Sequence, residues 1–93
     1  MDSRVTDNES ESRFELRLDG ELAGIIDYRR AGDTVALTHA EVRPELRNRG
    51  HAETMTREAL ADLKRRGLKA QPVCPFVVAY VRRHPEAIEG SEG

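Results

Sequence analysis

The stretch 42-VRPELRNRGHA-52 joins a predicted strand to a predicted helix and decides the arrangement of the chain. Arg43-Pro44 should end the strand, because proline lacks an amide donor and pushes the preceding residue into an extended conformation. After Gly50, apolar residues recur at a spacing of three or four, which predicts an amphipathic helix. These apolar residues are Ala52, Met55, Ala59, Leu60 and Leu63.

Three strands are predicted before this stretch. Residues 13–19 alternate between apolar and charged side chains, which is typical of a half-buried strand. Asp19-Gly20 predicts a tight hairpin turn into a second strand over residues 22–30. A third strand over residues 34–42 carries few charges, so we expect it in the centre of the sheet with both faces covered.

After the helix, the chain returns to the sheet once more. Lys64-Arg65-Arg66 complements the helix dipole, and Gly67 can adopt the left-handed conformation that ends a helix. Residues 68–73 predict a strand parallel to 34–42, and residues 75–83 predict a second helix. The expected fold is α/β (α+β), in the order β-β-β-α-β-α, with helices packed on a mixed sheet.

Length and composition limit the possible functions. The 93 residues suffice for one domain, which we place at residues 13–88 between polar, disordered tails at 1–12 and 89–93. The formal net charge of −2 argues against nucleic-acid binding. No apolar run is long enough to span a membrane, and a single cysteine fits a reducing, cytoplasmic setting. No metal site is predicted, and a monomer and a homodimer are both compatible with the sequence.

The start of the predicted helix after Gly50 is a candidate anion site. Its first amides have no internal acceptor, and the helix dipole favours negative charge there. Gly50 would let a diphosphate approach the backbone, and Arg47 and Arg49 would add positive charge. The alternative is an ordinary strand–helix turn with two solvated arginines.

The sequence Arg47-x-x-Gly50-x-Ala52 resembles the acetyl-CoA signature of the GNAT acyltransferase superfamily. The whole of residues 14–86 is most similar to its minimal branch, the short GNAT-like predicted acetyltransferases. The segments that carry this resemblance include 38-THAEV-42 and 74-CPF-76. It implies a GNAT fold and an acetyl-CoA cofactor whose pantetheine arm enters a gap between strands 34–42 and 68–73. The implied cofactor-binding residues are Val42, Arg47, Asn48, Arg49, Gly50, His51, Ala52 and Cys74.

Four residues are candidates for catalysis. His39 and Glu41 share a strand face and would deprotonate the acceptor amine, unless His39 is a buried structural histidine and Glu41 pairs with an arginine. Cys74 is expected at a helix N-terminus, where a thiolate that accepts the acetyl group is favoured; otherwise it is a small buried side chain. Tyr80 is near the place where the superfamily often has a tyrosine that protonates the departing thiolate, or it is a packed aromatic residue.

The sequence therefore predicts an acetyl-CoA-dependent N-acetyltransferase that acts on a primary amine, such as that of a protein or peptide. Compared with the usual family fold, the chain has no room for helices between the first two strands or for strands after the last helix. Because those parts normally wall the acceptor site, that site is expected to be open or supplied by a partner. Two alternatives are a CoA-binding module without turnover and a small interaction domain without a cofactor.

Overall fold

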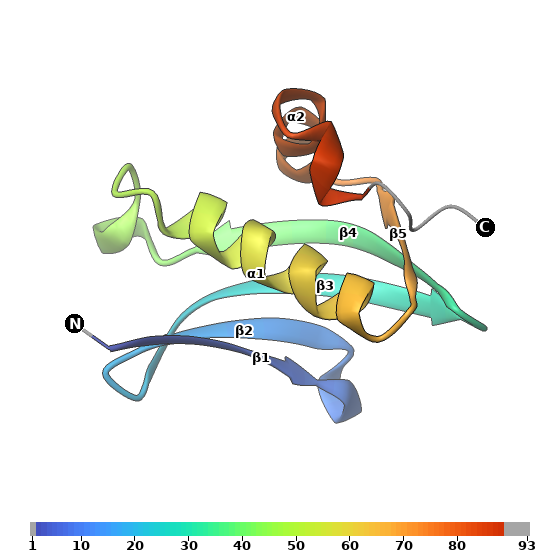
Figure 1. The fold of residues 1–93 in the computed structure, drawn as a ribbon. Helices are drawn as coiled ribbons and strands as arrows, with labels where there is room; N and C mark the ends of the chain where they lie inside the picture. Colours follow the sequence, from blue (N-terminus) through green and yellow to red (C-terminus); the bar gives the residue numbers. More distant parts are fainter. Residues whose placement is uncertain (1, 89–93) are drawn as a thin grey trace.

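The computed structural model describes residues 2–88, which form a five-stranded sheet with two helices (Figure 1). The sheet order is β1-β2-β3-β4-β5, with α1 across one face and α2 beside the β4–β5 end. The elements are β1 (Ser3–Asn8), β2 (Arg13–Leu18), β3 (Glu21–Ala31), β4 (Thr34–Val42), α1 (His51–Arg65), β5 (Lys69–Pro72) and α2 (Pro75–Arg83), with short 3-10 helices η1 (Glu9–Glu11), η2 (Pro44–Leu46) and η3 (Pro85–Ala87).

The predicted fold class is confirmed, and most elements lie where the sequence predicted them. Strands β1 to β4 are antiparallel, and β5 pairs parallel with β4. Asp19 and Gly20 both have positive φ, which fits the right-handed twist of a two-residue hairpin. At the end of α1, Gly67 has a φ of 72°, and the Leu68 amide donates to the Leu63 carbonyl at 2.9 Å. This pattern of bonds is the Schellman motif that a glycine after a helix predicts.

The prediction of a disordered tail over residues 1–12 was wrong for residues 3–11, which form β1 and η1. Six of these residues form β1, which pairs with β2 along its whole length, from Ser3 opposite Leu18 to Asn8 opposite Arg13. Val5 packs against the core, and the Tyr28 hydroxyl donates to Asp7 Oδ1 at 2.6 Å. A prediction from hydrophobic content missed β1, because polar residues make up most of this strand. The predicted tail at 89–93 lies outside the described residues.

Asp7 also connects the first strand to the end of the helix. Arg66 Nη1 lies 2.9 Å from Asp7 Oδ2 and 2.7 Å from Asp62 Oδ2. Burial is the largest cause of a raised pKa at Tyr28, and the bond to Asp7 raises it further. The Tyr28 phenol therefore stays protonated and donates its hydrogen bond throughout the physiological pH range.

The prediction that β4 is covered on both faces was also wrong, although β4 does have a neighbour on each side. In the register with β3, Asp27 pairs with His39 and Tyr28 with Leu37, so Thr38 is an extra residue that forms a β-bulge. Val35 and Leu37 are buried before the bulge, whereas Val42 is buried after it. The bulge therefore leaves His39 and Glu41 exposed on the face opposite α1.

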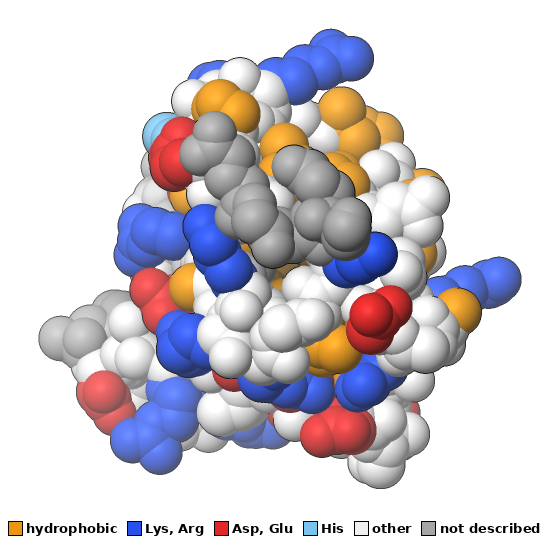
Figure 2. Space-filling view, turned by 45° about the vertical axis from the view of Figure 1, so that its right-hand side comes forward, with side chains coloured by type: hydrophobic (Ala, Val, Ile, Leu, Met, Phe, Trp, Pro, Cys, Tyr) orange, Lys and Arg blue, Asp and Glu red, His pale blue; other side chains and the backbone are white. Residues whose placement is uncertain are grey.

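Charged side chains are spread over the side of the molecule that is formed by the β3–β4 hairpin, the end of α1 and β5. Lys and Arg side chains are spread over this view, with Asp and Glu side chains between them (Figure 2). Exposed basic residues in these elements include Arg29, Arg30, Lys64 and Arg65. The small net charge of the chain thus comes from mixed charges rather than from an uncharged surface.

Gly24 allows α1 to lie close to the middle of the sheet. A Cβ atom at this position would lie 2.9 Å from the Glu41 carbonyl oxygen and 3.1 Å from Met55 Sδ. Both distances are shorter than an ordinary van der Waals contact, so a side chain here would push β4 or α1 away. Gly24 therefore sets the distance between β3 and the first turns of α1.

We predict that Gly24→Ala lowers the free energy of unfolding by about 1–3 kcal/mol, because an added methyl group overpacks this contact. The variant is compared with the wild type by urea unfolding. Gly20→Ala is the control, since its Cβ would meet nothing within 4 Å and only the positive φ of 87° would cost stability. A strand glycine without a steric conflict would gain stability on becoming alanine, so an unchanged or more stable Gly24→Ala contradicts this role.

Glu15 is a buried carboxylate on the face of β2 opposite α1. It accepts hydrogen bonds from Asn8 Nδ2 at 3.0 Å, Arg13 Nε at 2.9 Å and Arg17 Nη2 at 3.1 Å. The bond from Asn8, followed by that from Arg13, lowers the pKa of Glu15 below its ordinary value. The ionised form of Glu15 therefore ties β1 to β2.

We predict that Glu15→Gln lowers the free energy of unfolding by about 1–2 kcal/mol at pH 7, because it weakens hydrogen bonds to a charged acceptor. The folded-state pKa lies below the unfolded one, so this stabilisation is complete above the unfolded pKa and is lost as the pH falls through the folded value. Urea midpoints of both proteins between pH 7 and pH 3 should therefore converge in acid. A difference that stays constant over this range would contradict the assignment.

Candidate active site

The parallel pair β4–β5 separates after four residue pairs, the last of which is Leu37 with Pro72. The Leu37 carbonyl then accepts two amides, from Val73 at 3.1 Å and from Cys74 at 2.9 Å. Beyond that point β4 continues to Val42, while the chain after β5 turns into α2. In the described part of the chain, the second half of β4 is paired only with β3, which leaves a gap on its other side.

The start of α1 faces this gap. Gly50 is the N-cap residue, with a φ of 81°, and Asn48 two residues earlier has a φ of 63°. The first intrahelical bond is donated by Thr54 to the Gly50 carbonyl, at 3.1 Å. The amides of His51, Ala52 and Glu53 precede this bond, so they have no acceptor within the helix. A Cβ at Gly50 would meet nothing within 4 Å, which leaves room for a ligand beside these amides.

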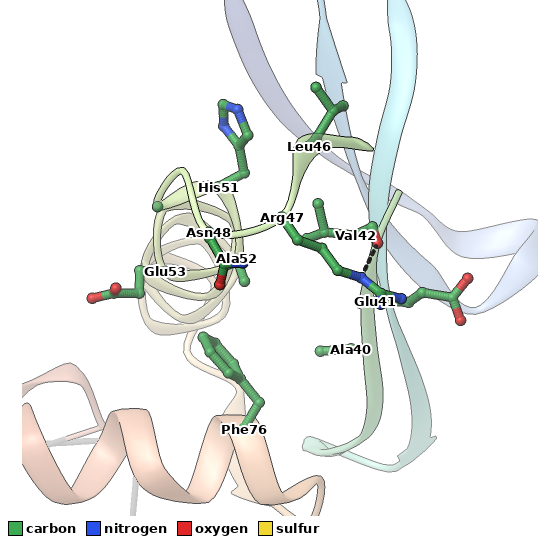
Figure 3. Close-up of a pocket in the computed structure, with 11 residues that line it drawn as sticks. Ala40, Glu41, Val42, Leu46, Arg47, Asn48, His51, Ala52, Glu53 and Phe76 are labelled. Carbon is green, nitrogen blue, oxygen red and sulfur yellow. Dashed lines mark hydrogen bonds between the residues drawn. The ribbon is translucent and has the colours of Figure 1, made fainter. Parts of the chain in front are cut away.

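A cavity of about 320 Å³ lies between the end of β4, the start of α1 and the start of α2 (Figure 3). Phe76 reaches from α2 toward the first turn of α1, and Ala40 lies on the β4 side. Six of the predicted cofactor-binding residues line the cavity, namely Val42, Arg47, Asn48, Gly50, His51 and Ala52. The others in its wall are Ala40, Glu41, Leu46, Glu53 and Phe76.

The two arginines of the predicted anion site differ in position. Arg47 lines the cavity, and its Nε donates to the Val42 carbonyl at 3.2 Å (Figure 3). This bond holds the guanidinium near the end of β4 and leaves its terminal N–H groups for a ligand. Arg49 is exposed and does not line the cavity.

His39 and Glu41 lie together on the other face of the sheet. His39 Nε2 is 3.1 Å from Glu41 Oε1, and their side chains are 56% and 60% exposed. His39 is therefore not a buried structural histidine, and Glu41 is paired with His39 rather than with an arginine. In Figure 3 the Glu41 carboxylate points away from Phe76 and the start of α1.

Cys74 lies at the N-cap of α2, as its position before Pro75 predicted. Its side chain is buried in the core cluster and makes no capping hydrogen bond. It does not line the cavity beside Gly50, although its amide is one of the two that bind the Leu37 carbonyl at the gap.

Tyr80 is separated from the His39–Glu41 pair. It lines a second cavity, of about 430 Å³, between α1 and α2, together with Arg57, Lys64 and His84. The Tyr80 and His84 rings have centroids 4.6 Å apart, and burial raises the pKa of the Tyr80 phenol. Glu53 lines this cavity as well as the one beside Gly50, so the two adjoin along α1.

Sequence reasoning did not assign a role to Phe76 or Glu53. Phe76 lies in the first turn of α2, on the side that faces α1, and an aromatic residue directly after Cys74-Pro75 was the available signal. Glu53 is exposed and lies outside the apolar stripe of α1, and no local signal in the sequence marks its position between two cavities.

A mixed sheet, a separated parallel strand pair and a glycine-capped helix start at the gap agree with the GNAT-like fold that the sequence resemblance implied. The fold is similar to the crystal structure of the ribosomal-protein-S18-alanine N-acetyltransferase from Escherichia coli, with a TM-score of 0.62 and 17% identity. That match covers 92% of this chain and 53% of the other, so the chain spans about half the length of that protein. Nourseothricin acetyltransferase is matched at a TM-score of 0.48 and 20% identity, over 91% of this chain and 66% of that one.

The family follows from the sequence match. The model of the GCN5-related N-acetyl-transferase family matches residues 13–89, and the chain belongs to this family of acyltransferase enzymes. No curated protein sequence matches the chain.

Two further observations concern other kinds of site. Between residues 2 and 88, no helix is long and apolar enough to cross a membrane. The same residues contain no group of three His, Cys, Asp or Glu side chains placed to hold a metal ion.

Proposed function

We propose that this domain transfers an acetyl group from acetyl-CoA to a primary amine. The observation that carries the proposal is the cavity beside Gly50, which joins free helix amides and Arg47 to the gap next to β4. An anion at a helix start and an extended arm along an unpaired strand edge are what a CoA thioester requires. Acetyl-CoA, once bound, would supply the activated acetyl group.

In this proposal the residues from Arg47 to Ala52 bind the diphosphate. The amides of His51 and Ala52 point out of the helix start, and the dipole of α1 adds partial positive charge. Arg47 contributes a full positive charge near the end of β4. Arg49 is exposed and contributes to the local potential rather than to a direct contact.

The acceptor amine must lose its ammonium proton before it can attack the thioester carbon. We assign this step to the His39–Glu41 pair, directly or through water, because the pair is exposed and hydrogen-bonded at 3.1 Å. Attack forms the C–N bond and breaks the C–S bond, and the nitrogen releases a second proton. The leaving thiolate takes up one proton, so the overall reaction releases one.

Tyr80 and Cys74 are the candidates for the leaving-group side. A raised pKa keeps Tyr80 protonated at neutral pH, so it has a proton to donate to a thiolate. Cys74 lies at the start of α2 beside the gap, but its thiol is buried, which favours direct transfer over a route through an acetylated cysteine.

A CoA-binding module without turnover remains the second candidate. It is favoured by the exposure of the β4 face opposite α1, because the His39 and Glu41 side chains there are open to solvent rather than enclosed in an acceptor site. Release of the CoA thiol in the presence of amines and peptides distinguishes the two functions. Tight CoA binding without thiol release above background would establish the module.

We predict that acetyl-CoA binds the full chain in isothermal titration, and that Arg47→Ala and Gly50→Glu each weaken binding about tenfold or more. Loss of a hydrogen bond to a charged group costs about 1.5–3 kcal/mol, and a carboxylate at Gly50 would repel the diphosphate. Arg30→Ala is the matched control, because Arg30 is exposed at the far end of β3. No binding at millimolar acetyl-CoA would overturn the proposed function.

We predict that no acetyl adduct forms on Cys74 and that Cys74→Ala retains transfer, because the thiol is buried. Intact-protein mass spectrometry after incubation with acetyl-CoA detects the adduct, and thiol release measures transfer. An adduct that disappears in Cys74→Ala, together with loss of transfer, would instead establish the two-step route.

A further inference from the structure

We propose that the sheet face opposite α1 binds the acceptor, and that this face selects a peptide N-terminal amine followed within two residues by an acidic side chain. The inference rests on the proposed acetyl transfer and names the substrate class for it. It depends on a cavity separate from the one beside Gly50 and on the opposite charges of Glu41 and Arg43 at the end of β4.

A third cavity, of about 380 Å³, lies on this face of the sheet. Leu22 and Ile25 of β3 provide an apolar floor, and Glu41 and Arg43 lie along one side at the end of β4. Arg13 of β2 lies on the other side. The cavity is open to solvent along the sheet, so an extended chain segment fits it better than an enclosed small molecule.

The Glu41 carboxylate makes its side of this cavity suited to an ammonium group. Glu41 Oε1 lies 3.1 Å from His39 Nε2, and this one contact satisfies only part of the acceptor capacity of the carboxylate, which leaves room for a ligand ammonium.

Arg43, just beyond the end of β4, makes that end of the cavity suited to a carboxylate. Arg43 Nη2 lies 2.9 Å from Glu45 Oε2, and a guanidinium has five N–H donors, so Arg43 retains donors for an anionic ligand group. Glu41 and Arg43 are two residues apart on an extended chain, a spacing of roughly 6–7 Å.

This spacing matches an extended peptide that starts with a free amine. One residue of extended chain spans roughly 3.3–3.6 Å, so an acidic side chain one or two residues after the amine can reach Arg43 while the amine contacts Glu41. A basic side chain at the same place would meet the guanidinium of Arg43. The charges thus favour an acidic second or third residue and disfavour a basic one.

Glu41 connects this cavity to the proposed chemistry. It is the residue that lines both the cavity beside Gly50 and the cavity on the opposite face, while its carboxylate points away from Phe76 and the start of α1 (Figure 3). An amine held by Glu41 therefore lies across β4 from the cofactor cavity.

The test compares three peptides that differ only at the second residue, which is Glu, Gln or Lys. With acetyl-CoA and the full chain, thiol release should give a kcat/KM about three- to fivefold higher for the Glu peptide than for the Gln peptide, as expected for exposed ion pairs. The Lys peptide should be poorer still. Arg43→Glu should reverse this order, whereas the control Arg29→Glu, with the same charge change at the far end of β3, should leave it unchanged.

Equal rates for the three peptides, or an order that survives Arg43→Glu, would overturn the inference while leaving acetyl transfer intact. If CoA binds and no peptide is acetylated, the transfer itself fails, and binding decides the inference. In amide NMR spectra of the ¹⁵N-labelled chain saturated with CoA, the Glu peptide should then shift the signals of Ile25, Glu41 and Arg43, and Arg43→Glu should weaken that binding. Absence of these shifts would overturn the inference.

Discussion

The double hydrogen bond at the Leu37 carbonyl is the interaction on which the rest of the site depends. Because this oxygen accepts the amides of both Val73 and Cys74, the parallel pairing of β4 and β5 stops there and the chain turns into α2. The second half of β4 is then left with one ladder partner. Such an exposed strand edge is normally a liability, and here the two helices and the cavity beside Gly50 adjoin it.

A second constraint brings the helix start to this edge. Gly24 has no side chain to hold α1 away, so Met55 packs over β3 and the first turn of α1 lies beside the end of β4. The polar amides after Gly50 and the apolar packing at Met55 therefore come from the first two turns of α1. Together they place an anion site beside the gap next to β4. The connection between β4 and α1 is the longest in the described part of the chain, and it suffices to bring the helix start there.

The sequence predicted the parts of this arrangement that depend on local signals. Pro44, Gly50 and Gly67 mark the ends of elements through their own backbone preferences, and the structure has elements ending at those places. It failed where tertiary contacts decide. The first strand is held by a hydrogen bond that Asp7 accepts from Tyr28 and one that Asn8 donates to Glu15, so its polar sequence resembled a tail.

The bulge at Thr38 shows why the faces of β4 were harder to predict than its ends. An uninterrupted period of two would put Leu37, His39 and Glu41 on one face with the core, whereas one extra residue moves His39 and Glu41 to the other. The same extra residue turns Ala40 and Val42 toward the cavity beside Gly50. A single strand thereby presents apolar side chains to the proposed cofactor and titratable ones to the proposed acceptor. In this arrangement β4 is the partition between the two substrates, and its open edge is where they would meet.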